Sequence, residues 1–369
     1  MSDVSLVDAT DHATHDSDAD PASGLPREFR GLVYPFGHDV PHAGQMIEVA
    51  SGVFWMRLVL PMSLNHINLY ILDDGDGWAI VDTGMNTDCC RTQWEAMFEG
   101  PLAGRPVTRI ICTHFHPDHL GLAGWLCERF SVPLWISRTE YLLARSLMLD
   151  AQKDVPGDVV TFYRQAGWSE QALDVLKARG WGNFAKAAWP LPIGFHRMKA
   201  GDTLAIGSVD WRVIVGTGHA PEHVCLVCDD KQIMISGDQV LPRITSNVSV
   251  FPTEPMGNPL KDWFDSLDML RTQSDDLFIL PAHNEPFRNL YVRVDQLKQD
   301  HSEKLIRLKE FLVEAKTAME CFSVLFRKPV SAGEMGIATG EALAHLRYLE
   351  VTGTIKRITD KPQHRFQTL

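Results

Sequence analysis

Three histidines and one aspartate fall within six consecutive positions of this sequence, directly after an apolar run. Residues 113–119 read THFHPDH. In an extended turn His114 and His116 point the same way, because side chains alternate with a period of two, while Asp118 and His119 can turn toward a second point nearby. Imidazole and carboxylate groups suit zinc, and also iron or manganese where carboxylates take part. The segment therefore predicts two adjacent metal sites.

Further single histidines and aspartates follow later apolar runs, where strand ends can bring them to the same place. The run GTGH ends at His219, SGD ends at Asp238 and PAH ends at His283. The alternative explanation for residues 113–119 is a polar loop with histidines by chance. Three of the chain's fifteen histidines lie in that loop, and three more candidate ligands appear where a metal site needs them. A metal centre is therefore the better explanation.

Short strand-like and helix-like segments alternate along the chain, as expected of an α/β protein. Strands are predicted at 46–49, 53–60, 67–72, 78–82, 107–112, 132–136, 202–206, 211–215, 224–228, 232–236 and 277–280. Helices are predicted at 91–98 and 121–130. Residues 138–198 break the rhythm as a helical insertion, with helices at 140–151, 159–166 and 170–178. The second group of strands repeats the layout of the first.

Four regions are predicted from composition and patterning. Residues 1–25 contain few bulky apolar residues, so we expect a disordered tail. Residues 26–290 form the α/β domain, and an amphipathic helix within 291–316 bridges to a small module. Residues 317–369 contain two short helical patterns and a strand pair, the outline of a winged helix. This module is locally basic, with three more basic than acidic residues from position 321 onward.

The motifs HxHxDH, GTGHA, SGDQ and PAH, in this order, resemble those of the metallo-β-lactamase superfamily over roughly residues 46–290. The C-terminal module adds a resemblance to the lactamase-β-like and glyoxalase II-like subgroup. The resemblance implies an αββα sandwich, here with a helical insertion and a winged-helix domain, and two divalent metal ions, with zinc preferred to iron or manganese. The implied ligands of the first ion are His114, His116 and His219, and those of the second ion are Asp118, His119 and His283. Asp238 is the implied ligand of both ions.

Catalytic roles are assigned to two of these carboxylates, Asp118 and Asp238. Two divalent ions lower the pKa of a shared water and polarise the carbonyl or phosphoryl oxygen that it attacks. Asp118 can steer this nucleophile or accept its proton. By the resemblance, Asp82, in the sequence DTG, orients the ligand loop, and His223 is predicted to support a ligand by hydrogen bonding.

Substrate contacts are predicted at positions with weaker signals. His66 and Asn68 lie on a predicted edge strand, and Arg243 and Asn247 follow Asp238. A salt bridge within the fold explains Arg243 equally well. Aromatic residues of the insertion pack in a core more often than they bind substrate, but any that line the cleft favour a bulky, apolar or aromatic acyl group. These aromatic residues are Trp181, Phe184 and Trp189.

Two substrate classes remain open for such a hydrolase. The first is a small-molecule thioester or ester, of the acyl-CoA or acyl-glutathione type. The second is single-stranded RNA, cleaved as by an endoribonuclease, with its backbone held by Lys356, Arg357, Lys361 and Arg365. A net charge of −12 and the aromatic insertion favour the first class. A lactonase is a further alternative, whereas a non-catalytic binding module is disfavoured by the complete ligand set.

The cellular setting is expected to be the cytosol. The N-terminus lacks the pattern of a secretory signal, which disfavours a secreted β-lactamase, and no run approaches the roughly 18 apolar residues that cross a membrane. Seven cysteines lie scattered in apolar segments, which predicts reduced, mostly buried thiols. Strand burial explains Cys225 and Cys228 without a metal. We expect a small-molecule substrate, no membrane partner and a homodimer.

Overall fold

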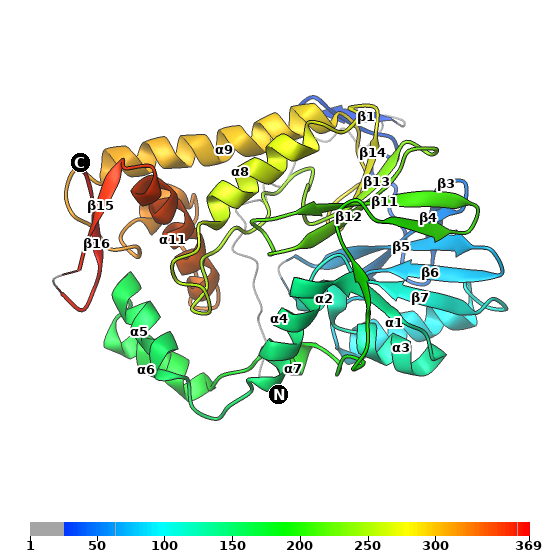
Figure 1. Ribbon diagram of the computed structural model, residues 1–369, viewed down its shortest axis with the longest axis horizontal. Helices are drawn as coiled ribbons and strands as arrows, with labels where there is room; N and C mark the ends of the chain where they lie inside the picture. The colour runs from blue at the N-terminus through cyan, green and yellow to red at the C-terminus, as the bar shows by residue number, and fades with distance from the viewer. Residues whose placement is uncertain (1–25, 63, 360) are drawn as a thin grey trace.

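Two β-sheets pack face to face, and helices cover both outer faces (Figure 1). The computed structural model describes residues 26–62, 64–359 and 361–369, so the predicted tail at 1–25 lies outside the described residues. Three apolar clusters separate the four layers, one between the sheets and one under each layer of helices. The predicted αββα sandwich is therefore confirmed.

The first sheet contains seven strands in the order β3-β4-β5-β6-β7-β8-β9. They are β3 (Met46–Ala50), β4 (Val53–Val59), β5 (His66–Asp74), β6 (Gly77–Val81), β7 (Val107–Ile111), β8 (Leu134–Ser137) and β9 (His196–Met198). Neighbours from β3 to β6 pair antiparallel, and neighbours from β6 to β9 pair parallel. Because β9 belongs to this sheet, the predicted insertion at 138–198 extends too far. Three mostly polar residues give no strand pattern by themselves, so only pairing with β8 defines β9.

The second sheet contains five strands in the order β10-β11-β12-β13-β14. They are β10 (Thr203–Ile206), β11 (Val209–Gly216), β12 (His223–Cys228), β13 (Ile233–Gly237) and β14 (Phe278–Pro281). A small hairpin of β1 (Arg27–Phe29) and β2 (Leu32–Tyr34) precedes both sheets. The sequence gives no prediction for this hairpin, because its strands are only three residues long.

Helices on the outer faces of the sandwich are α1 (Asp88–Glu99), α3 (Ala123–Phe130), α8 (Pro259–Leu270) and α9 (Leu290–Phe311). The insertion contains α4 (Arg138–Leu149), α5 (Gly157–Ala166), α6 (Glu170–Arg179) and α7 (Phe184–Ala187), and a single turn, α2 (Pro117–Leu120), lies in the first ligand loop. Within the described part of the chain, no helix has the length and apolar character needed to cross a membrane.

The C-terminal module follows α9 and packs on the insertion side of the sandwich (Figure 1). It contains α10 (Phe322–Leu325), α11 (Met335–Val351) and a hairpin of β15 (Ile355–Ile358) and β16 (Arg365–Thr368). One helix is thus a single turn and the other is long, whereas two short helices were predicted. Because α11 contacts α5, α8 and α9, it is apolar on several sides and has a weak amphipathic pattern. The winged-helix assignment stays a prediction.

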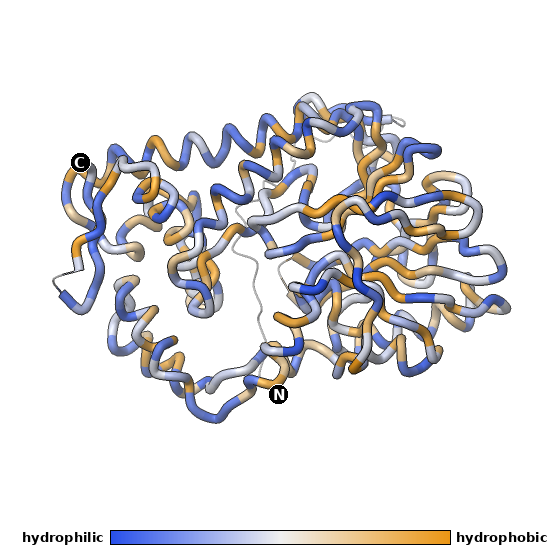
Figure 2. The backbone as a smooth tube through the Cα atoms, in the orientation of Figure 1, coloured by the Kyte–Doolittle hydropathy of each residue, from blue (hydrophilic) through white to orange (hydrophobic). Residues whose placement is uncertain are grey.

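Figure 2 shows that the strands at the centre of the sandwich are rich in apolar residues. Strands β5 and β12 are buried on both faces. In β5, Tyr70 and Leu72 face the core between the sheets, while Ile71 packs under α1 and α3. In β12, Cys228 faces the core between the sheets and Cys225 faces the opposite layer. The two thiols of the CxxC sequence therefore lie on opposite faces, as expected for side chains three positions apart in a strand, and cannot bind one metal ion.

Gly218, in the turn after β11, packs closely against α8. Its φ is +101°, and a Cβ there would lie 2.6 Å from the backbone of Trp263. We expect Gly218→Ala to lower the free energy of unfolding by about 2–4 kcal/mol, because it adds backbone strain to a steric clash. Urea unfolding measures this. Gly157→Ala is the control, since its Cβ meets nothing within 4 Å. Equal stability of Gly218→Ala and the wild type would contradict the close packing.

Candidate metal centre

Five loops that follow strands bring the predicted ligands and Asp82 to one edge of the sandwich. Strand β6 leads to Asp82, β7 to the loop 113–119, β11 to His219, β13 to Asp238 and β14 to His283. These strand ends lie on the same side of the two packed sheets, so residues separated by up to two hundred positions meet in space. The sandwich thus assembles a site that no single segment contains.

Asp82 fixes the first ligand loop to the end of β6. Its φ is +62°, a left-handed conformation that aspartate tolerates better than most residues. Its carboxylate accepts hydrogen bonds from the backbone N–H of Thr113 at 2.8 Å and from His119 Nδ1 at 2.8 Å. Asp82 therefore holds the loop in place and turns His119 Nε2 toward the other ligands.

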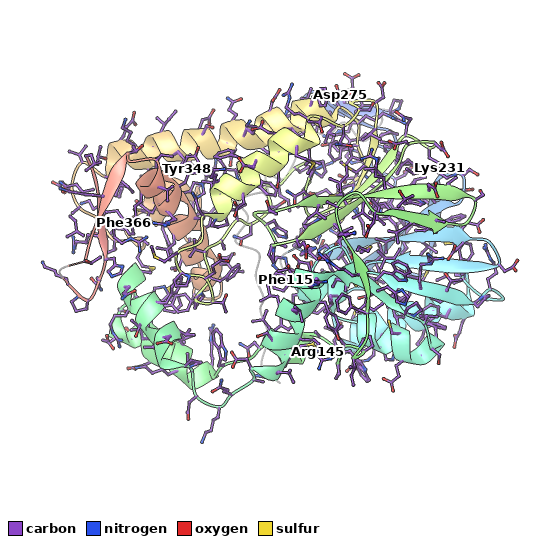
Figure 3. The ribbon with its side chains drawn as sticks, viewed as in Figure 1. Phe115, Arg145, Lys231, Asp275, Tyr348 and Phe366 are labelled. Atoms are coloured by element: carbon purple, nitrogen blue, oxygen red, sulfur yellow. The ribbon has the colours of Figure 1, made fainter. Side chains whose placement is uncertain are left out.

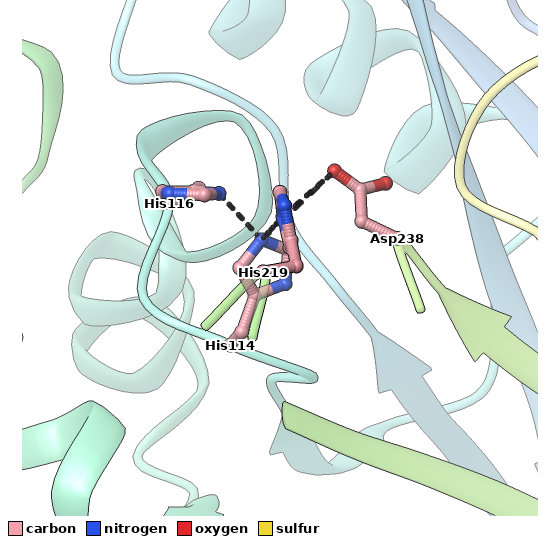
Figure 4. A group of neighbouring side chains, drawn as sticks. All are labelled: His114, His116, His219 and Asp238. Atoms are coloured by element: carbon pink, nitrogen blue, oxygen red, sulfur yellow. Dashed lines mark hydrogen bonds and ion pairs between the residues drawn. The ribbon is translucent and has the colours of Figure 1, made fainter. Parts of the chain in front are cut away.

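One cluster of candidate ligands consists of His114, His116, His219 and Asp238 (Figure 4). His114 Nε2 lies 2.8 Å from His116 Nδ1 and 3.2 Å from His219 Nε2. His219 Nε2 lies 3.4 Å from Asp238 Oδ2. Ligand atoms about 2.1 Å from a tetrahedral zinc ion stand about 3.4 Å apart, so most of these spacings are close to those around one ion.

A second cluster consists of Asp118, His119 and His283, and it adjoins the first at Asp238. Asp118 Oδ2 lies 3.6 Å from His119 Nε2 and 3.4 Å from His283 Nε2. Asp238 Oδ2 lies 3.4 Å from the Nε2 atoms of both His119 and His219, and Asp238 Oδ1 lies 3.4 Å from His283 Nε2. Asp238 is thus located between the clusters, where a carboxylate can bridge two ions.

Hydrogen bonds at Nδ1 orient two more imidazoles, as Asp82 orients His119. His219 Nδ1 donates to the carbonyl oxygen of Asn247 at 2.7 Å, and His283 Nδ1 donates to the carbonyl oxygen of His66 at 2.8 Å. A proton fixed at Nδ1 leaves the Nε2 lone pair free on the side of the cluster. These rings therefore have the tautomer that a metal ligand needs.

Burial and neighbouring charges set the protonation of the cluster. Burial lowers the pKa of His114 well below its usual value and lowers the pKa of His116 to about 3, so both are neutral at neutral pH. Burial alone would raise the pKa of Asp118, but the neighbouring His119 and His283 lower it to about 2. Neutral imidazoles and ionised carboxylates are the forms that bind divalent metals.

Unpartnered polar atoms test whether the cluster fits a metal. His119 Nε2 and Asp238 Oδ1 are buried and have no hydrogen-bond partner. Burial works to lower the pKa of His119, but the carboxylates of Asp238 and Asp118 outweigh it and raise that pKa well above its usual value. This point of the site therefore attracts positive charge, and buried atoms without partners are costly unless a cation binds them. The donor set fits divalent metal ions.

His223 supports the cluster from behind. It is fully buried, its Nε2 accepts a hydrogen bond from the backbone N–H of Asp238 at 3.1 Å, and its ring stacks on that of His114 with centroids 4.7 Å apart. His223 therefore contacts His114, which follows a strand of the first sheet, and Asp238, which follows a strand of the second sheet.

His66 and Asn68 do not lie on an edge strand, because β5 is flanked by β4 and β6. This prediction was wrong, since the sequence does not show that β3 and β4 pair beyond β5. Asn68 Nδ2 donates to the carbonyl oxygen of Pro281 at 2.9 Å, and His66 Nε2 accepts from the backbone N–H of Asn284 at 2.9 Å. Both residues hold the loop that contains His283.

Arg243 and Asn247 have different environments. Arg243 forms a salt bridge of 3.0 Å with Glu285, and its guanidinium lies over the ring of Tyr34 at 5.4 Å from the centroid. These contacts match the alternative explanation, a salt bridge within the fold. Asn247 lines a cavity beside the ligands and accepts a hydrogen bond from Ser249 Oγ through its side chain.

Two buried charged residues near the site were missed by the sequence reasoning. Glu140 accepts hydrogen bonds from the backbone N–H groups of Phe115 and Glu222, so it links the loop 113–119 to the loop that contains His219. Burial raises the pKa of Glu140 to about 7. Arg293 donates to the carbonyl oxygens of Leu241 and Ile244. A charged residue on the apolar side of a predicted helix was the available signal for both.

An apolar cavity of about 290 Å³ opens beside the candidate ligands. Phe115, labelled in Figure 3, is one of the residues that line it. Its polar end is formed by His116, Asp118, His219 and Asp238. The remaining walls come from the insertion, the segment after β4, the segment after β13, and α11. Apolar lining residues from these segments include Met62, Leu64, Leu143, Leu147, Trp181, Phe184, Phe251 and Ile337.

Among the aromatic residues of the insertion, Trp181 and Phe184 line this cavity. The indole N–H of Trp189 instead donates to Glu128 Oε2 at 3.3 Å. The contribution of Phe251 and Ile337 could not be predicted, because the sequence does not show that the segment after β13 and α11 lie beside the candidate ligands.

Two relatives match most of this chain, one by structure and one by sequence. A crystal structure of a beta-lactamase domain protein from Burkholderia ambifaria superposes with a TM-score of 0.84 and 38% identity, covering 92% of this chain and 98% of that one. The protein named "Probable metallo-hydrolase YqjP" from Bacillus subtilis is 22% identical over 325 residues, covering 86% of this chain and 98% of that protein.

A further relative, named atrochrysone carboxyl ACP thioesterase, from Aspergillus fumigatus, is 21% identical over 257 residues. The match covers 69% of this chain and 46% of that protein.

Family models match both parts of the chain. The model of the metallo-beta-lactamase superfamily matches residues 63–283, and the model described as "Metallo-beta-lactamase-like, C-terminal domain" matches residues 305–369. The first match spans more than half of the sequence and contains every candidate ligand. With the clusters of His and Asp described above, the chain belongs to the metallo-beta-lactamase superfamily and is a metal-dependent hydrolase.

Proposed function

We propose that this protein hydrolyses a thioester or ester whose acyl group is bulky and apolar, with zinc as the metal. The observation that carries the proposal is the cavity of about 290 Å³, which has candidate metal ligands at one end and mainly apolar side chains elsewhere. Such a cavity suits a molecule with one polar, reactive group and an apolar body. Insertion residues Trp181 and Phe184 supply much of the aromatic surface.

The candidate ligands and their neighbours divide the work of hydrolysis. When bound, two divalent ions lower the pKa of a shared water and polarise the carbonyl that it attacks. Asp118 is ionised and lines the cavity, so it can accept a hydrogen bond from the attacking water and orient it. Phe115 and Phe184 exclude bulk water from the same space.

The named thioesterase among the relatives supports an acyl thioester as the substrate. RNA is a weaker candidate, because the cavity lining includes neither lysine nor arginine. In the C-terminal module, Arg357 and Arg347 both bind Glu350, at 2.7 and 2.8 Å. Arg365 donates to a backbone carbonyl oxygen. These arginines are used within the fold, so a substrate panel should place thioesters first and include a lactone and single-stranded RNA.

Removing the shared carboxylate tests the metal-dependent mechanism. We expect Asp238→Ala to lower kcat about 10³-fold or more and to reduce bound metal, because Asp238 lies between both clusters. His116→Ala should act similarly through the first cluster alone. Rates and elemental analysis are compared with Asp230→Ala, which removes an exposed aspartate. Full turnover by metal-depleted Asp238→Ala would contradict the mechanism.

Trimming the cavity wall tests the apolar acyl group. Leu147→Ala should lower kcat/KM for a long-chain acyl thioester about tenfold, because each buried methylene contributes about 0.8 kcal/mol, and should leave an acetyl thioester nearly unchanged. Leu142→Ala is the control, since Leu142 lies on the same helix and is 56% exposed. If both variants retain wild-type kcat/KM for the long chain, the acyl group does not bind along α4.

A further inference from the structure

We propose that α9 and α11 position the metal ligands by holding the segment 238–250. Metal binding then depends on these two helices, although neither contains a candidate ligand. The inference deepens the proposed function, on whose metal centre it rests. It concerns metal binding, whatever the substrate. The segment begins at Asp238, directly after β13, and ends where Val250 meets α11.

The segment contacts the metal centre at two points, Asp238 and Asn247. Asp238 is itself a candidate ligand, and its carbonyl oxygen accepts a hydrogen bond from Ser246 Oγ. The carbonyl oxygen of Asn247, the residue after Ser246, accepts a hydrogen bond from His219 Nδ1 at 2.7 Å. The position of this carbonyl therefore sets both the tautomer and the orientation of His219.

Helix α11 holds the far end of the segment. The backbone N–H of Val250 donates to the carbonyl oxygen of Gly340 at 3.0 Å. Ser249 packs so closely on this helix that a Cβ at Gly340 would lie 2.8 Å from its Cβ and from its Oγ. Ser249 Oγ in turn donates to Asn247 Oδ1 at 2.6 Å. Gly340 is thus linked to His219 through Ser249 and Asn247.

Helix α9 holds the middle of the segment through a buried cation. Arg293 is 7% exposed, and its guanidinium donates to the carbonyl oxygens of Leu241 at 2.5 Å and Ile244 at 2.7 Å. Burial lowers the pKa of Arg293 to about 10, so it stays charged at neutral pH. Burying a charge is costly, and the two carbonyl groups offset the cost only while the segment keeps its course.

A merely structural role for these contacts predicts something different. If α11 only covers an apolar face, changes at Gly340 alter stability and leave the metal centre of the folded protein unchanged. If α11 positions His219, the same change weakens metal binding in a protein that remains folded. Helix α11 contains two glycines, Gly336 and Gly340. They allow a matched comparison, because an added Cβ would meet very different surroundings at the two positions.

The experiment compares Gly340→Ala with Gly336→Ala in the full chain, by titrating metal-depleted protein with Zn²⁺ against a competing chelator and by thermal unfolding. At Gly336 an added Cβ meets only the Tyr163 hydroxyl, at 3.7 Å. Both changes replace glycine with a better helix former. We expect Gly340→Ala to weaken binding of one Zn²⁺ equivalent roughly ten- to hundredfold, and Gly336→Ala to bind as the wild type does.

Ser249→Ala supplies a second variant that adds no steric clash. It removes the hydroxyl that orients Asn247, and we expect a smaller weakening of the same Zn²⁺ equivalent, about threefold to tenfold, with unchanged Tm. Wild-type Zn²⁺ affinity in Ser249→Ala and in folded Gly340→Ala would overturn the inference. Should Gly340→Ala fail to fold, Ser249→Ala decides alone. Failure of the metal centre itself is recognised separately, because wild-type protein would then bind no Zn²⁺.

Discussion

Seven imidazole and carboxylate side chains are packed against one another at the edge of the sandwich, and their ligand atoms face a common space with few hydrogen-bond donors. Such an arrangement is unfavourable for polar atoms removed from water unless a cation binds them. The surrounding structure supplies what the cluster cannot supply itself. Asp82, the carbonyl oxygen of Asn247 and the carbonyl oxygen of His66 each fix one ring, so that its Nε2 points inward.

The sandwich solves the problem of bringing these groups together, because strands from both sheets end at the same edge. The insertion and the C-terminal helices then convert an exposed edge into an enclosed cavity. Leu147, Phe184 and Ile337 come from three elements outside the sheets, yet all three face the space next to Asp118. Binding of an apolar acyl group would therefore depend on the parts of the chain that lie outside the sandwich.

The sequence alone was sufficient to predict most strands and the side chains that meet in the cluster of candidate ligands, for a physical reason. Ligands must be specific residue types at strand ends, so HxHxDH and the isolated His219, Asp238 and His283 leave a readable pattern. Strands that are buried on both faces are continuous runs of apolar residues, so they are also recognised from the sequence.

Features defined by tertiary contacts left no such pattern. Strand β9 exists only through pairing with β8, and the interior position of β5 depends on which strands pair beyond it. Arg293 and Glu140 stand out only as charged residues on the apolar side of predicted helices, and the sequence does not show their carbonyl and N–H partners. Long, apolar α11 packs against α5, α8, α9 and α10, so its sequence lacks the periodicity that marks an amphipathic helix.

The account as a whole depends on the cluster being a two-metal centre. Equilibrium dialysis of the wild-type protein against Zn²⁺, followed by elemental analysis, tests this most directly. We predict about two zinc ions per chain, both removed by a strong chelator. Less than about half an ion per chain at saturating Zn²⁺ would contradict the account, because the cluster would then be a buried polar network stabilised without metal.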